Sequence, residues 1–153
     1  MKSSELFLEI KRNIERYKSK LKYDNVIDEN TDSINSIMAK YNRDNFNEIM
    51  DISLGELNHY EIPNSEIEDF KKRIDYFFSL YSGEDEDFKE FIKLISLYLA
   101  FIAKKPLHPP GIIFSKERGV YKDQDVYYCT GKNEFSKDKL SLCKYCICNQ
   151  INP

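Results

Sequence analysis

Residues 88–103 read FKEFIKLISLYLAFIA, and this stretch decides the fold. Over 88–102 apolar residues fall on nearly every side of a helix, so we expect a central helix that other helices surround. Its most apolar part, 91–103, includes Lys93 and is well short of the ~20 residues that span a bilayer. The sequence therefore predicts a buried core helix that ends at Pro106 and no association with a membrane.

Upstream of this helix, four segments have helical rather than strand periodicity. The first runs over about 4–22, the second begins at a cap at Thr31 or Asp32, and Asp44 can cap the third. The fourth opens at Pro63 and stops near Gly83, and the acidic run 84–87 then begins the central helix. We therefore predict an all-α bundle of about five helices over residues 1–105.

The pattern changes in residues 106–153, which we call the tail. Pro109 and Pro110 exclude a helix there. Residues 119–121 and 126–128 flank a polar turn and predict a short β-hairpin, and 140–150 fit a short helix or turn. Because the tail has little apolar surface of its own, we expect it to be ordered by a metal or by packing on the helical body, forming one integrated unit.

Composition and charge fit one soluble domain. The chain has 153 residues, 41% hydrophobic and 32% charged, and its first residues lack the apolar stretch of a signal peptide. We expect a cytoplasmic protein, in which four cysteines are metal ligands or free thiols rather than disulfides. Residues 1–103 carry 14 Lys/Arg against 21 Asp/Glu and residues 104–153 carry 9 against 5, so the body is acidic and the tail basic.

All four cysteines lie in the tail. Cys143 and Cys146 form a C-x-x-C, a spacing that lets two thiolates bind one tetrahedral ion from a single turn. Cys129 follows the predicted hairpin, and His108 precedes the Pro-Pro-Gly turn. Zinc prefers thiolate and imidazole ligands, so the predicted structural zinc site is His108, Cys129, Cys143 and Cys146. Cys148 is the alternative fourth ligand, although binding both Cys146 and Cys148 to one ion would strain the loop.

Other interpretations of these residues stay open. The thiols could hold an iron–sulfur cluster, or be buried or free without a metal. A catalytic zinc would keep a position for water, with Glu117 or Glu134 as proton carrier, but nothing in the sequence fixes either near the ion. His59, in the third helical segment, is interpreted as a surface or core histidine.

The tail is also rich in tyrosine and lysine, which in other proteins stack on bases and neutralise phosphates. We favour the alternative that the tyrosines cover the metal site and dock it on the helices, because the basic excess is small for a nucleic-acid module. The residues concerned are Tyr127, Tyr128, Tyr145, Lys132, Lys137, Lys139 and Lys144.

The tail resembles the end of a family of short proteins from methanogenic archaea, known only as a domain of unknown function (2115). The resemblance rests on His108-Pro109-Pro110-Gly111, Tyr128-Cys129, Leu142-Cys143-Lys144-Tyr145-Cys146 and Gln150. It implies an archaeal, cytoplasmic protein and supports treating the predicted ligands as one set. The family pattern has a proline where Thr130 stands here and does not include Cys148. It brings no activity with it.

The sequence contains no G-x-S-x-G, Walker or G-x-G-x-x-G motif. The leading interpretation is therefore a non-enzymatic zinc-binding protein that acts by binding another macromolecule, a protein before any other. The alternatives are a nucleic-acid-binding module that uses the basic tail, and an iron–sulfur or redox protein.

Overall fold

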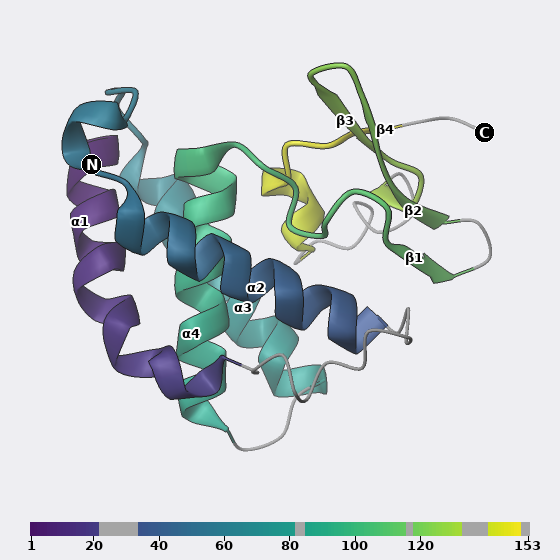
Figure 1. Cartoon of the computed structure of the whole chain (residues 1–153), viewed down its shortest axis with the longest axis horizontal. Helices are drawn as coiled ribbons and strands as arrows, with labels where there is room; N and C mark the ends of the chain where they lie inside the picture. Colours follow the sequence, from purple (N-terminus) through teal and green to yellow (C-terminus); the bar gives the residue numbers. More distant parts are fainter. Residues whose placement is uncertain (22–33, 82–84, 116–117, 133–140, 151–153) are drawn as a thin grey trace.

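The computed structural model describes residues 1–21, 34–81, 85–115, 118–132 and 141–150. Within these ranges four α-helices form a body, and a small β-sheet lies beside it (Figure 1). The helices are α1 (Ser3–Ile14), α2 (Ile34–Asp51), α3 (Asn64–Tyr81) and α4 (Glu86–Leu97). Two 3₁₀ turns, η1 (Glu15–Lys20) and η2 (Leu54–Glu56), follow α1 and α2, and a π-helical turn, η3 (Tyr98–Ala103), extends α4.

The predicted central helix is confirmed. Phe91 and residues 95–101 of α4 and η3 are buried, and α4 contacts α1, α2 and α3. Asp85 caps α4 by accepting a hydrogen bond from the Phe88 N–H at 3.0 Å. The helix ends at Lys104, which has left-handed φ of 55°, two residues before Pro106. None of the helices in the described part is long and apolar enough to cross a membrane.

The prediction of five helices is wrong for the described residues, because the expected second and third helices are one continuous helix, α2. Asp44 lies exposed in the middle of α2 and caps nothing there. The neighbouring Asn45 is buried, and its side-chain amide donates to the Tyr41 carbonyl at 2.9 Å. The buried amide of Asn45 therefore has a hydrogen-bond partner within the helix, and polar residues at this point do not interrupt it. The expected cap at Thr31 or Asp32 lies outside the described residues.

The predicted hairpin is confirmed as β2 (Arg118–Asp123) and β3 (Val126–Cys129), with Tyr121 opposite Tyr128. Two shorter strands extend it to a sheet of order β1-β2-β3-β4. β1 (Ile113–Ser115) pairs antiparallel with β2, and β4 (Asn149–Gln150) pairs parallel with β3. A 3₁₀ turn, η4 (Leu142–Tyr145), lies in the connection between β3 and β4.

The tail packs on the body through η4 and α3. The Tyr145 ring lies 5.5 Å from the Phe70 ring and 5.7 Å from the Phe101 ring, centroid to centroid. The Arg73 guanidinium donates to the Ser141 carbonyl at 2.8 Å and to the Asp69 carboxylate at 2.9 Å. The turn that carries Cys143 is therefore held by aromatic packing and by a buried cation on one helix.

Candidate metal centre

Cys143 and Cys146 lie at the two ends of one tight turn, as the C-x-x-C spacing predicts. Ser141 caps the turn by accepting a hydrogen bond from the Cys143 N–H at 3.1 Å. The Cys146 N–H then donates to the Cys143 carbonyl at 3.2 Å and closes the turn. Such a turn offers two sulfur ligands from one short segment.

Cys129 and Cys148 come from different segments and meet in one buried cluster. Cys129 ends β3, and Cys148 immediately precedes β4, which pairs with β3. Both thiols are buried and pack with Ile112 and Val120, and Cys146 packs against the same cluster. Two separated parts of the tail, the end of β3 and the segment before β4, therefore bring Cys129, Cys146 and Cys148 together on the inner side of the sheet.

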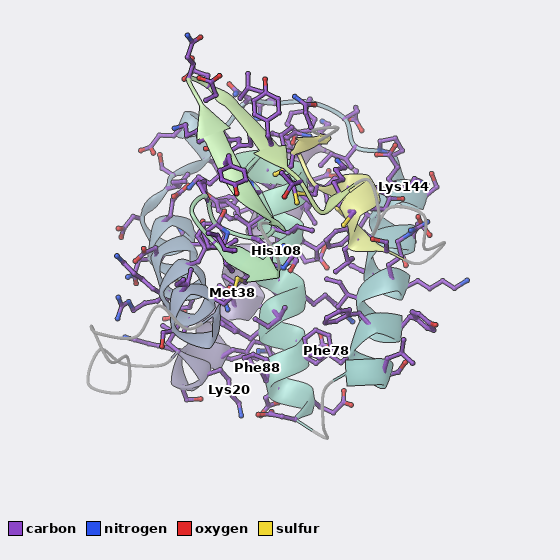
Figure 2. The ribbon with its side chains drawn as sticks, turned by 90° about the vertical axis from the view of Figure 1, so that its right-hand side faces the viewer. Lys20, Met38, Phe78, Phe88, His108 and Lys144 are labelled. Carbon is purple, nitrogen blue, oxygen red and sulfur yellow. The ribbon has the colours of Figure 1, made fainter. Side chains whose placement is uncertain are left out.

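Helix α2 closes this cluster from the side of the body. Ile37 and Met38 pack against the buried thiols, and Figure 2 shows Met38 beside the foot of the sheet. The Tyr41 hydroxyl donates to the Pro106 carbonyl at 2.6 Å. Burial is the main reason why the pKa of Tyr41 is raised, and nearby Tyr127 and Cys146 raise it further. The sequence placed these α2 residues in a helical core and gave no sign that they border the thiols.

The four thiols influence one another's protonation. The hydrogen bond that Cys148 donates lowers the pKa of Cys146, against the effect of burial, and the backbone N–H of Leu107 donates to the same sulfur. That hydrogen bond and burial raise the pKa of Cys148. Burial raises the pKa of Cys143, and nearby Cys146 and Cys129 add to this rise while the Ser141 hydroxyl opposes it. A hydrogen bond therefore joins Cys146 to Cys148, and Cys129 and Cys143 lie near this pair.

Lys132 fixes the loop that carries this pair. Its ammonium donates to the Cys146 carbonyl at 2.7 Å and to the Cys148 carbonyl at 2.6 Å. Its charge also favours the thiolate form of Cys146. From the sequence, Lys132 was considered as a phosphate contact. No spacing in the sequence indicated that it bonds to the carbonyls of the cysteine loop.

His108, the predicted fourth ligand, is positioned differently from the thiols. The residue as a whole has exposed surface, but burial of the imidazole lowers its pKa. Its neighbour Leu107 reaches Cys146, and Figure 2 shows His108 near the centre of the molecule, next to the strands. His59 is exposed, in the stretch between η2 and α3.

Among the described residues, no three His, Cys, Asp or Glu side chains lie close enough together to coordinate an ion as they stand. The donor set nevertheless has the right chemistry for a soft ion, because it consists of four thiols of which two are buried. A zinc ion would need the sulfurs to close to about 2.3 Å from it.

The fold and the thiol cluster define a class of protein: a helical body with a small cysteine-bearing tail, whose sheet meets α2 and whose turn η4 meets α3. The chain belongs to a family of uncharacterised proteins conserved in archaea (DUF2115), whose family model matches residues 3–151. The expected resemblance is thus confirmed.

Relatives come from methanogenic archaea. A UPF0305 protein of Methanocaldococcus jannaschii is 37% identical over 115 residues, which are 75% of this chain and 70% of the relative. A UPF0305 protein of Methanococcus maripaludis is 34% identical over 97 residues, 63% of this chain and 59% of the relative. A UPF0305 protein of Methanothermobacter thermautotrophicus is 28% identical over 113 residues, 72% and 68% of the two chains. No solved structure matches the chain closely.

Proposed function

We propose that this protein holds one structural zinc ion through Cys129, Cys143, Cys146 and Cys148, and that it acts by binding another protein rather than by catalysis. The observation that carries the proposal is that Cys129, at the end of β3, and Cys148, just before β4, meet in one buried cluster against which Cys146 packs, with Cys143 on the adjoining turn. Buried thiols from separate segments are a common arrangement for a metal that orders a small irregular tail.

Cys148 fits the fourth position better than His108. Cys148 is 1% exposed and bonds to Cys146, so the short loop already turns both thiols to the same side. The strain expected for this pair is therefore no obstacle to binding both. His108 is adjacent to Leu107, whose backbone N–H donates to Cys146, and we assign it to the loop that covers Cys146. Four sulfur ligands leave no open position for water, which supports a structural role.

Several tail residues offered for nucleic-acid binding have structural roles instead. Tyr145 packs between Phe70 and Phe101, and the Lys122 ammonium lies 5.6 Å from the centre of the Tyr127 ring. Lys132 is bonded to two carbonyls, and Lys144 lies 3.8 Å from Asp69. Lys137 and Lys139 lie outside the described residues. These contacts favour the protein-binding interpretation over the nucleic-acid one.

The test is the metal content of protein purified without oxygen, measured by elemental mass spectrometry together with visible absorbance. We expect one zinc per chain and no visible absorbance. Cys143→Ser and Cys148→Ser should lose the zinc, whereas His108→Ala should keep it. His59→Ala, at an exposed histidine away from the thiols, is the matched control and should be unchanged.

Each alternative gives a different result. Zinc lost in His108→Ala but kept in Cys148→Ser would restore the Cys3His set. Iron together with visible absorbance would mean that the thiols hold an iron–sulfur cluster instead of zinc. Metal-free protein would overturn the proposal and leave the thiols themselves as the functional groups.

A further inference from the structure

A cleft lies between α1 and α3 on the helical body, with α4 beneath it. Figure 1 shows α4 between these two helices, and α4 contacts both of them. The cleft has a volume of about 350 Å³. Cavities that hold small-molecule ligands in other proteins have volumes of about 300–1,000 Å³, so this cleft has room for a small ligand. The thiol cluster is built from α2 and the tail, so the cleft is a separate site.

The floor of the cleft is apolar. It is formed by two residues of α1 and two of α4, namely Leu6, Ile10, Leu94 and Leu97. Leu94 is half-buried and packs against the main core, and the other three side chains are buried beneath it. Because core packing fixes these side chains, they offer an apolar surface in a constant position. The floor can therefore hold the apolar part of a ligand out of water.

The rim of the cleft is polar and carries charges of both signs. Its members are Glu9, Asn13, Arg16, Tyr17, Lys71, Glu90 and Lys93. The Lys93 ammonium is already neutralised, because it lies 2.7 Å from the Asp75 carboxylate and 3.3 Å from the Glu90 carboxylate. These groups therefore leave the other rim charges to decide which ligand the cleft accepts.

Lys71 and Arg16 keep donor groups for which the described part of the chain supplies no acceptor. The Lys71 ammonium, on the α3 side, lies 3.8 Å from the Glu9 carboxylate, which is too long for a hydrogen bond. The Arg16 guanidinium donates one hydrogen bond, to the side-chain oxygen of Asn13 at 3.3 Å. Two cations, Lys71 and Arg16, thus stand against one carboxylate, Glu9, which leaves one positive charge in excess. The rim is therefore suited to a monoanion.

Local contacts hold the Arg16 guanidinium at the cleft. The Asn13 amide donates to the Glu9 backbone carbonyl at 2.7 Å, and this bond fixes the side-chain oxygen that Arg16 contacts. The Tyr17 ring lies 6.0 Å from the guanidinium carbon and supports it from the other side chain of the same turn. A guanidinium that is held in place binds a carboxylate through two parallel hydrogen bonds. A monocarboxylate therefore matches both this donor and the single excess charge.

We propose that the cleft between α1 and α3 binds a small organic monocarboxylate with an apolar body. The carboxylate bonds to Arg16 and Lys71 at the rim, and the apolar body lies on Leu94 and the residues beneath it. A phosphate monoester fits less well, because it carries about two negative charges. An uncharged apolar molecule would leave both cations without an acceptor. This site is independent of the proposed zinc centre and goes beyond it.

Titration of the isotope-labelled full chain with octanoate, followed by NMR, tests the site. We expect saturable binding at one site, with the largest shifts in the methyl groups of Ile10, Leu94 and Leu97. The methyl groups of Val120, in the thiol cluster, should stay in place. Octanol lacks the charge and acetate lacks the apolar body, so each should bind at least about tenfold more weakly than octanoate.

Variants of the two cations give a second readout. Arg16→Gln and Lys71→Gln should each raise the octanoate dissociation constant about tenfold, because each loses a charged hydrogen bond. Lys72→Gln is the matched control: it removes the same charge from an exposed lysine of α3 that does not line the cleft, and it should bind octanoate like the natural chain. Octanol that binds as tightly as octanoate, or variants that all bind like the natural chain, would overturn the proposal. So would the absence of octanoate binding, or shifts centred on the tail.

Discussion

The Tyr145 hydroxyl donates a hydrogen bond to the carboxylate of Asp69, 76 residues earlier in the chain. This bond ties the turn between Cys143 and Cys146 to α3, and the Tyr145 ring adds aromatic contacts with Phe70 and Phe101. Tyr145→Phe keeps the ring and loses the hydroxyl, so it should lower the free energy of unfolding by about 1 kcal/mol. Tyr145→Ala also loses the packing and should cost about 3 kcal/mol.

Urea unfolding followed by circular dichroism measures both changes. Tyr76→Phe is the control, because Tyr76 lies on the same helix and is exposed, and it should stay within about 0.5 kcal/mol of the natural chain. Equal stability of Tyr145→Ala and the natural chain would mean that η4 does not hold the tail on the body.

The backbone of Ile112 passes very close to the Cα of Gly119. A methyl group on its Cα would lie 2.3 Å from the Ile112 carbonyl oxygen, which belongs to the backbone and cannot turn away. Gly119→Ala should therefore disrupt the pairing of β1 with β2 and lower the unfolding free energy by about 2 kcal/mol. Gly55→Ala is the matched control, because nothing lies within 4 Å of a methyl group there. It should be neutral or slightly stabilising by denaturant unfolding, and equal losses at both glycines would refute the steric argument.

Glu48 makes part of the stability depend on pH. Burial alone would raise the pKa of its carboxyl, but hydrogen bonds from Lys105 and Tyr98 outweigh it and lower the pKa below 4.5. The folded state therefore prefers the carboxylate. Its contribution is fully present above the unfolded pKa and is lost as the pH falls through the lower folded pKa. Unfolding free energies between neutral pH and about pH 3 should show the difference between the natural chain and Glu48→Gln shrink on acidification.

Asp51→Asn supplies the comparison for this pH series. Asp51 is an exposed carboxyl at the end of the same helix, so Asp51→Asn should not reproduce the loss of stability of Glu48→Gln at neutral pH. A gap between the natural chain and Glu48→Gln that stays constant down to pH 3 would count against the role given to Glu48.

Metal removal should loosen the tail before the body. With a zinc chelator, the amides of β2, β3 and η4 should exchange hydrogen faster, because ligand binding then no longer adds to their stability. The amides of α1 and α4, which lie in the main core, should keep their protection. Hydrogen exchange by mass spectrometry measures both regions, and Cys143→Ser should respond little to the chelator. Unchanged exchange throughout the natural chain would mean that packing alone orders the tail.

The central helix and the hairpin were predictable because their signals are local. Residues 88–102 are apolar on nearly all sides, and only a surrounded helix buries such a surface. The break predicted at Asp44 was wrong because α2 continues through these polar residues, with Asp44 exposed and the amide of the buried Asn45 bonded to the Tyr41 carbonyl. The strands β1 and β4 are only three and two residues long, so no periodicity could reveal them.

The candidate site was predictable in its residue types more than in its geometry. The C-x-x-C spacing predicted that Cys143 and Cys146 lie on one turn, because this arrangement depends only on local sequence. The closeness of Cys129 and Cys148 depends on the parallel pairing of β3 with β4, a contact between distant segments that leaves no pattern in one sequence. Lys132, which bonds two carbonyls of the cysteine loop, is likewise visible only in three dimensions.

The connection between the parallel strands β3 and β4 contains η4, and η4 is the part that rests on α3. The pairing of β4 with β3 therefore depends on a connection that packs on the surface of the helical body. An evolutionary exchange that moved residues 106–153 onto another protein would carry the cysteines but leave Asp69 and Phe70 behind. We expect the tail of such a graft not to fold. The body and the tail should therefore be inherited together, and substitutions in α3 should limit which substitutions the tail tolerates.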